Sequence, residues 1–518
     1  MLSLLLHRFP RATLLPLCLV LSLATDISAA PDQRVMVAMA DGVRLETFVY
    51  LPGTQPAPVV LLRTPYRFPG QSEPYYDSFA NALTERGYVF VLQNIRGRFG
   101  SEGVFDPFEN AVADGAATVG WITGQPWSNG RIGTIGGSYN GYTALAAAVG
   151  SDAVRTVVAD DPALDLWAGR RGGAVGLLPV FWLHLLDHGR WPDDAARAWA
   201  SNETNPLQID NLLLGRDDPF WQAYLEGHAD STEKSLRGQL DRICAPVLVL
   251  KSKSEGWEDP VDLWQALRQD GCLRHREAHQ LIVTAEDHTF HLDQLGSGPT
   301  DVTQHVLDWL DHWLRDADAP AGAPVLYRPD AAEPFRNAGD WPVRGTETSF
   351  YLGQQFSLTG NGHLLQAPAQ KAGAHSLAID PAILSPCEDY PRQTYLSAPL
   401  DQDLLLAGPA RLELFVRGTT GRAGLSAQLY DYDPDRPTAL QFVSFAVAQV
   451  DALAVEAPQV VTLNMHSLSH RFEAGTRIAL SLSGSACGYG EADHPAGVYE
   501  ILHGADTPSR LVIEAVAE

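Results

Sequence analysis

The segment Arg131-Ile-Gly-Thr-Ile-Gly-Gly-Ser138-Tyr-Asn-Gly-Tyr142 passes from a β-branched run through two glycines and a serine into an alanine-rich run. β-Branched residues favour strands and alanine favours helices, so the segment predicts a strand, a tight corner and a helix. The glycines remove Cβ atoms that would clash where the helix folds back on the strand. A serine at such a corner presents its hydroxyl at the carboxyl edge of a sheet. We therefore expect a nucleophile elbow at Ser138, with the Tyr139 N–H as an oxyanion donor.

On both sides of this segment, expected strands and helices alternate. Asp41-Gly42 lies between two alternating apolar runs and predicts a hairpin over 34–51. The expected strands are 59–62, 88–92, 132–135, 155–159, 245–250 and 280–283, and the expected helices are 75–86, 109–123, 261–268 and 300–315. This alternation predicts a doubly wound, mostly parallel sheet covered on both faces, as in an α/β-hydrolase.

Two regions depart from the alternation. Residues 163–240 lack buried-strand runs and are rich in tryptophan, which predicts an inserted helical cap. Residues 316–324 have the composition of a linker, and short alternating runs follow, which predicts a C-terminal jelly-roll β-sandwich. The expected domains are 31–162 and 241–318 for the two parts of the hydrolase domain, 163–240 for the cap and 325–518 for the jelly roll.

Composition excludes some classes of partner. The chain of 518 residues has a formal net charge of −25, which argues against nucleic acid or an anionic membrane as a partner. Residues 1–30 combine an early basic region, a short apolar run and small residues at the exit, as in a signal peptide. We therefore expect an exported protein, periplasmic or secreted, with no membrane partner after signal cleavage.

Export permits disulfides. The expected mature chain keeps Cys244, Cys272, Cys387 and Cys487, and four cysteines allow three pairings. Pairing Cys244 with Cys272 and Cys387 with Cys487 would respect the expected domains. Four buried free thiols are the alternative.

A nucleophilic serine needs a base, usually a histidine held by a carboxylate, and on this fold the acid precedes the histidine in the chain. Asp259 follows the expected strand 245–250, and His288 follows the strand 280–283. Each lies in a loop at the carboxyl end of a strand, where it could reach Ser138. Local competitors for the two roles are Glu255, Glu258, Asp287 and His291.

Several motifs together resemble a known family. They are Asp41-Gly-Val-Arg-Leu45, Arg63-Thr-Pro-Tyr66, Arg96-Gly-Arg-Phe-Gly-Ser-Glu-Gly103, Gln125-Pro-Trp-Ser-Asn-Gly130, Gly136-Gly-Ser-Tyr-Asn-Gly141 and Gly256-Trp-Glu-Asp259. In this order, and over nearly the whole expected mature chain, the sequence resembles the serine hydrolases that include X-Pro dipeptidyl-peptidases, bacterial cocaine esterase and α-amino-acid ester hydrolases (CocE/NonD-type hydrolases).

The resemblance implies a residue for each catalytic role. It makes Ser138 the nucleophile, Asp259 the orienting acid and His288 the base, with the Tyr66 phenol beside the Tyr139 N–H in the oxyanion hole. It implies the same three-part fold, and no metal or cofactor. The sequence departs from the family pattern before His288, where Ala285-Glu-Asp replaces the usual Gly-Pro-Trp.

We expect the substrate to be a small ester or a short peptide. Trp167 and Trp257 are candidate walls of the substrate pocket. Past Asp259 a single acid, Asp262, stands where the amine-binding relatives are expected to carry an adjacent pair, so we expect ester hydrolysis first. The alternatives are an X-Pro dipeptidyl-peptidase and a non-catalytic binding protein on a hydrolase scaffold. The sequence does not determine the oligomeric state.

Overall fold

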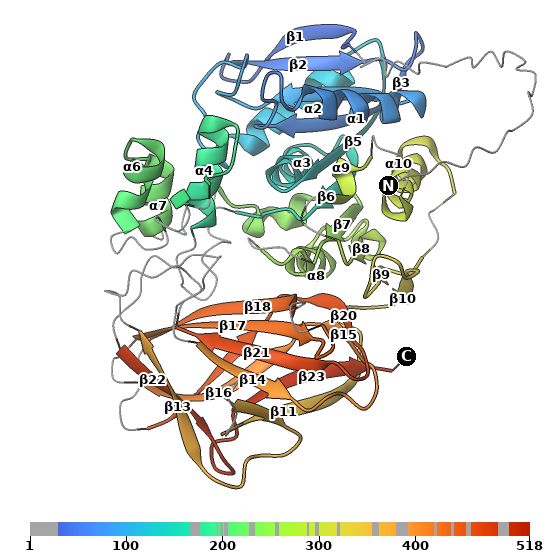
Figure 1. Cartoon of the computed structure of the whole chain (residues 1–518). Helices are drawn as coiled ribbons and strands as arrows, with labels where there is room; N and C mark the ends of the chain where they lie inside the picture. Colours follow the sequence, from blue (N-terminus) through green and yellow to red (C-terminus); the bar gives the residue numbers. More distant parts are fainter. Residues whose placement is uncertain are drawn as a thin grey trace, which may run out of the picture.

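The computed structural model contains two units, each built on its own sheet (Figure 1). It describes residues 30–165, 177–193, 195–196, 200, 206–226, 234–253, 258–286, 288, 290–295, 300–318, 322–354, 362–379, 392–418, 422–436, 440–451, 457–484 and 497–517. Within these residues, no helix is long and apolar enough to cross a membrane. The predicted signal peptide lies outside the described residues, so export remains a prediction.

The N-terminal unit is built on a mixed sheet with the order β1-β2-β4-β3-β5-β6-β7-β8-β9-β10. Its strands are β1 Gln33–Ala38, β2 Arg44–Tyr50, β3 Ala57–Thr64, β4 Val89–Asn94, β5 Ser128–Gly137, β6 Val154–Asp160, β7 Val247–Lys251, β8 Gln280–Val283, β9 Val325–Tyr327 and β10 Arg336–Ala338. Strands β4 to β9 in this order are parallel, and the predicted hairpin forms β1 and β2. The predicted mostly parallel sheet is confirmed.

Helices cover both faces of this sheet. They are α1 Glu73–Glu85, α2 Ala111–Thr123, α3 Tyr139–Gly150, α8 Pro260–Asp270, α9 Phe290–Asp293 and α10 Asp301–Arg315. Successive residues of β3 point to opposite faces, so Val59 and Leu61 pack in the core with α2, α3 and α8, and Val60 and Leu62 in the core with α1 and α10. Two separate apolar layers therefore hold the sheet.

The described residues between β6 and β7 form helices joined by loops. These are α4 Leu178–His188, η3 Pro206–Gln208, α6 Ile209–Leu214, α7 Pro219–Glu226 and η5 Arg237–Arg242. Figure 1 shows α4, α6 and α7 gathered beside the carboxyl end of the sheet. Trp182 and Trp221 join the same apolar core as α3, which fastens the insertion to the sheet.

The C-terminal unit is rich in strands, as predicted, and has a separate core. Its strands are β11 Thr346–Gln354, β12 Gly362–Leu365, β13 Gly373–Ile379, β14 Arg392–Ser397, β15 Leu404–Gly408, β16 Arg411–Gly418, β17 Arg422–Tyr432, β18 Leu440–Asp451, β19 Gln459–Asn464, β20 Leu468–Phe472, β21 Arg477–Ser483, β22 Gly497–His503 and β23 Arg510–Val516. The pairing is antiparallel except between β12 and β14.

One predicted boundary differs from the structure. We expected the C-terminal domain to begin at residue 325, but β9 pairs parallel with β8 and antiparallel with β10. Both strands therefore extend the first sheet. The physical reason is that β8 would otherwise leave its backbone groups unpaired at a sheet edge.

Cys244 and Cys272 form a disulfide, with their Cα atoms 5.0 Å apart. The bond joins the segment before β7 to the segment after α8, and it is one of the pairings that the sequence allowed. Cys387 and Cys487 lie outside the described residues, so their state remains a prediction.

Candidate active site

Ser138 occupies the corner between β5 and α3 in a strained conformation, with φ 55° and ψ −125°. Its amide donates to the Asp160 carbonyl oxygen at the end of β6, 2.8 Å away. A Cβ atom on Gly136 would lie 2.2 Å from the Asn140 carbonyl oxygen, so only glycine fits under the first turn of the helix. The predicted tight corner is thus enforced by contact between strand and helix.

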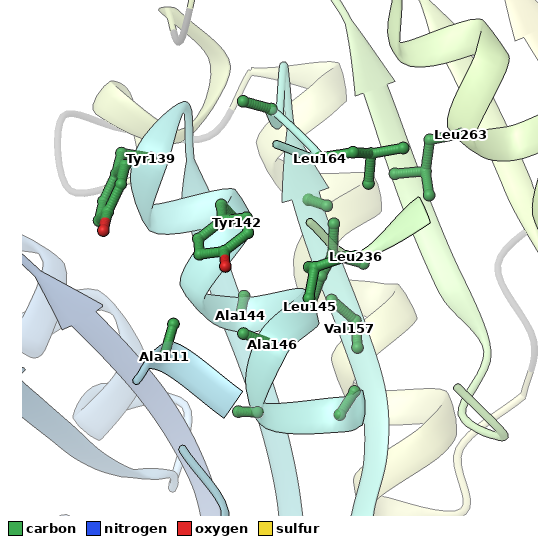
Figure 2. Packing of buried hydrophobic residues seen from close by; sticks show 14 of the residues in the cluster. Ala111, Tyr139, Tyr142, Ala144, Leu145, Ala146, Val157, Leu164, Leu236 and Leu263 are labelled. Atoms are coloured by element: carbon green, nitrogen blue, oxygen red, sulfur yellow. The ribbon is translucent and has the colours of Figure 1, made fainter. Parts of the chain in front are cut away.

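Helix α3 holds the corner rigidly because its first turns are buried. The Thr143 hydroxyl donates to the Arg63 carbonyl oxygen of β3, 2.7 Å away. Tyr139 and Tyr142 project from the start of the helix (Figure 2), and Leu145 of the helix belongs to the same apolar core as Leu236. The Tyr139 N–H lies at the first helical position, where no preceding turn supplies an acceptor. An oxyanion formed at Ser138 could use this donor.

Tyr66 lies two residues beyond the end of β3 and is brought to Ser138. Its amide donates to the Thr64 hydroxyl, 3.0 Å away, and the Trp182 indole Nε1 donates to its phenol oxygen, 2.8 Å away. Burial raises the pKa of Tyr66, and the hydrogen bonds with Trp182 and Ser138 only partly oppose that rise. The phenol therefore stays protonated near neutral pH and remains a donor.

Asp259 is buried at the N-terminus of α8 and is held by two backbone amides. Its Oδ1 accepts from Val261 N at 3.2 Å, and its Oδ2 accepts from Ser467 N at 2.7 Å. Ser467 belongs to the C-terminal unit, and its hydroxyl accepts from Trp341 Nε1 at 2.6 Å. The carboxylate is therefore fixed between the two units.

His288 follows β8 and its side chain is 39% exposed. Its Nδ1 lies 3.5 Å from Oδ2 of Asp161, a buried residue directly after β6, whose Oδ1 accepts from Ser252 N at 2.9 Å. Burial acts to raise the pKa of Asp161, but the neighbouring His288 and Lys251 hold that pKa below its usual range. Asp161 is thus an ionised carboxylate beside the expected base.

The structure brings Tyr66 to Ser138 but does not bring Asp259 to His288. In the described part of the chain, the Asp259 carboxylate accepts its hydrogen bonds from the amides of Val261 and Ser467. Asp161 was missed in the sequence, although its place at the carboxyl end of a parallel strand is the signal that singled out Asp259.

The competitors for the two roles have structural partners. His291 is buried, with Nδ1 3.0 Å from Asp160 Oδ1 and Nε2 2.6 Å from the Thr284 hydroxyl. Glu258 accepts from Leu164 N at 2.8 Å and pairs with Arg237. Trp167, Glu255, Trp257 and Asp287 lie outside the described residues. Among those described, no three His, Cys, Asp or Glu side chains group to hold a metal ion.

Comparison with known proteins assigns the arrangement to a family. Residues 41–290 match the family model for X-Pro dipeptidyl-peptidase (S15 family), and residues 319–512 match that for the X-Pro dipeptidyl-peptidase C-terminal non-catalytic domain. The chain belongs to the X-Pro dipeptidyl-peptidase (S15) family. As a member of this family it is a serine hydrolase.

The relatives of this S15 hydrolase include both sequences and solved structures. The cocaine esterase of Rhodococcus sp. (strain MB1 Bresler) is 28% identical over 532 aligned residues, covering 87% of this chain and 90% of the esterase. An aminopeptidase from a marine sediment Thaumarchaeota archaeon has a TM-score of 0.78 at 19% identity, covering 96% of this chain and 99% of its own. An α-amino acid ester hydrolase has a TM-score of 0.76 at 19% identity, covering 95% and 100%. The two structures establish the shared fold.

Proposed function

We propose that this S15 hydrolase cleaves a carboxylic ester through an acyl-enzyme formed on Ser138. The observation that carries the proposal is the strained corner at Ser138, with the protonated Tyr66 phenol beside it. In the first step the Ser138 oxygen attacks the ester carbonyl and His288 takes the hydroxyl proton. The Tyr66 phenol and the Tyr139 N–H stabilise the resulting oxyanion. The imidazolium then protonates the leaving alcohol, and water attacks the acyl-enzyme by the same route in reverse.

Asp259 is the proposed acid that orients His288. Support comes from its two amide donors, which hold the carboxylate in one place at the N-terminus of α8. In the present structure the imidazole lies beside Asp161 instead. The proposed mechanism therefore requires the His288 imidazole to leave Asp161 and contact Asp259 when substrate binds.

An ester is the first choice of substrate. Support comes from the cocaine esterase, which aligns along 90% of its own length. Removal of dipeptides from X-Pro peptides is the alternative within the same family, and a non-catalytic binding role is the alternative outside catalysis. Trp167 and Trp257 remain proposed walls of the substrate pocket.

We also propose a cap, a jelly roll and export for this protein. We take the helices between β6 and β7 as a cap over the site, and the C-terminal unit as a jelly roll. We also propose export through a signal peptide in residues 1–30. The Cys244–Cys272 disulfide supports export, because disulfides persist in oxidising compartments.

Labelling with a fluorophosphonate probe tests the nucleophile. We expect the wild-type chain to be labelled and Ser138→Ala not to be labelled. Rates with p-nitrophenyl acyl esters and with Gly-Pro-p-nitroanilide then distinguish the two enzymatic choices, and faster esters are the expected result. The wild-type chain could also be folded and yet neither react with the probe nor hydrolyse either substrate. That result would favour the non-catalytic binding role.

A further inference from the structure

Helix α4 reaches the expected oxyanion hole with the indole of Trp182. The Trp182 indole Nε1 lies 2.8 Å from the Tyr66 phenol oxygen. An indole nitrogen can donate a hydrogen bond but cannot accept one. The phenol oxygen must therefore accept this bond, and its own single proton is left to point elsewhere.

We propose that Trp182 is a positioning residue that turns the Tyr66 hydroxyl proton toward the substrate oxyanion, so that α4 completes the oxyanion hole. The inference rests on the proposed function, since it gives meaning to the orientation of Tyr66 only if that phenol acts in catalysis. It makes the inserted helices part of the chemistry and not only a cover.

The indole is held in place by aromatic packing. Trp182 is buried, and its ring centroid lies 5.1 Å from that of Tyr139 and 5.9 Å from that of Phe220 on α7. Tyr139 is the residue whose amide is the second oxyanion donor. The same ring thus packs on one donor residue and hydrogen-bonds the other, which fixes the direction of its N–H.

Arg98 ties the two segments together at a second point. Its Nε donates to the Pro65 carbonyl oxygen at 3.1 Å, and its Nη2 donates to the Leu186 carbonyl oxygen at 2.9 Å. Pro65 directly precedes Tyr66, and Leu186 lies one helical turn after Trp182. The guanidinium therefore keeps α4 and the Tyr66 segment at a constant separation, as the indole–phenol bond requires.

The orientation of the Tyr66 hydroxyl should affect the rate of catalysis. Without a donor at Trp182, the phenol can turn its proton away from the oxyanion, and only part of the population donates to it. The oxyanion exists only along the reaction path, so the loss should appear in kcat and leave KM nearly unchanged. A single neutral hydrogen bond sets the scale at roughly fivefold to tenfold.

A double-mutant cycle tests the inference. Trp182→Phe keeps a ring in the aromatic cluster and removes the N–H, and Tyr66→Phe removes the hydroxyl. We expect Trp182→Phe to lower kcat for a p-nitrophenyl ester roughly fivefold to tenfold, and to have no further effect when Tyr66 is already Phe. Trp221→Phe is the matched control, because it removes another buried indole from α7 in the same core. We expect its kcat to equal that of wild type.

Two results would overturn the inference while the proposed function stands. One is an unchanged kcat in Trp182→Phe, and the other is a set of losses that multiply in the double variant. Undiminished kcat in Tyr66→Phe would remove the oxyanion role of Tyr66 and the inference with it. If Trp182→Phe does not fold, 3-benzothienylalanine at position 182 keeps the shape of the indole without its N–H, and the same loss of kcat is expected.

Discussion

Two buried aspartates follow neighbouring strands of the first sheet, and one of them lies beside the expected base. Asp161 follows β6 and faces His288, and Asp259 follows β7 and is bound by amides from both units. A carboxylate orients a catalytic imidazole only if the two remain in contact during turnover. The proposed mechanism gives that role to Asp259 and treats the contact with Asp161 as a state outside turnover.

Replacing each aspartate in turn by asparagine shows which of the two carboxylates orients His288. We expect Asp259→Asn to lower kcat by about 10³–10⁴-fold, because the amide cannot stabilise the imidazolium. Asp161→Asn should cause a much smaller loss, and it serves as the control for removing a buried charge. Steady-state kinetics with one p-nitrophenyl ester measures both. A large loss in Asp161→Asn with little change in Asp259→Asn would move the acid role to Asp161.

His291 should make the stability of the folded chain depend on pH. Burial acts to lower its pKa, but the Asp160 carboxylate, helped by Asp161 and Glu286, raises that pKa above its ordinary value. A raised pKa in the folded state means that the charged imidazole stabilises the fold fully below the unfolded value of about 6.5. This stabilisation is lost as the pH rises through the folded pKa.

We therefore expect the difference in Tm between wild type and His291→Gln to be larger at pH 6 than at pH 9. Thermal denaturation at both pH values measures it, and exposed His363→Gln controls for the loss of an imidazole. A difference that grows toward pH 9 would show that the neutral form is the one stabilised.

The expected site residues that belong to local patterns could be proposed from the sequence. Ser138 and Tyr66 could be predicted because each lies just past a buried strand, within a short motif. Trp182, Asp161 and Ser467 could not be assigned in the same way. Their roles come from contacts between segments far apart in the chain, such as the indole of α4 meeting the phenol after β3.

At the scale of elements, the turn from β5 to α3 depends on the absence of a side chain at Gly136. A methyl group there would meet the Asn140 carbonyl oxygen at 2.2 Å. We expect Gly136→Ala to cost at least about 3 kcal/mol or to prevent folding, because backbone atoms cannot move aside. Thermal denaturation and soluble yield measure the effect.

Gly120→Ala is the matched control. Gly120 is exposed on α2, and a methyl group there would contact nothing within 4 Å. Alanine in a helix is better than glycine by roughly 0.5–1 kcal/mol, so this variant should be slightly stabilised. Equal stability of the two variants would contradict the steric account of the elbow.

Most strands and helices of the N-terminal unit follow the periodicity of the sequence, because each buried element carries its own apolar pattern. The capping box at Thr300, for example, begins α10 where the sequence placed it. Strands β9 and β10 were not predicted. Each has three residues, too few to show a period, and their pairing depends on the edge that β8 offers.

At the scale of the whole molecule, a chain of hydrogen bonds connects the C-terminal unit to the expected site. Trp341 donates to the Ser467 hydroxyl, and the Ser467 amide donates to Asp259. Gln265 of α8 donates to the Trp341 carbonyl oxygen, 3.0 Å away. The two units are therefore joined at the carboxylate that the proposed mechanism uses.

Ser467→Ala tests this connection. It leaves the buried Trp341 N–H without its acceptor, which should cost about 1–3 kcal/mol, and it loosens the segment that binds Asp259. We expect a lower Tm together with a lower kcat. Ser469→Ala is the control, because the buried Ser469 hydroxyl has no hydrogen-bond partner among the described residues. If both variants behave alike, the link between the units does not position Asp259.

The most direct test of the account is to locate the acyl group during turnover. The enzyme is quenched with acid while it hydrolyses a p-nitrophenyl ester, digested, and its peptides are analysed by mass spectrometry. The account predicts that the acyl group is found on Ser138 and is absent from Ser138→Ala. An acyl group on another residue, or hydrolysis by Ser138→Ala at the wild-type rate, would contradict it.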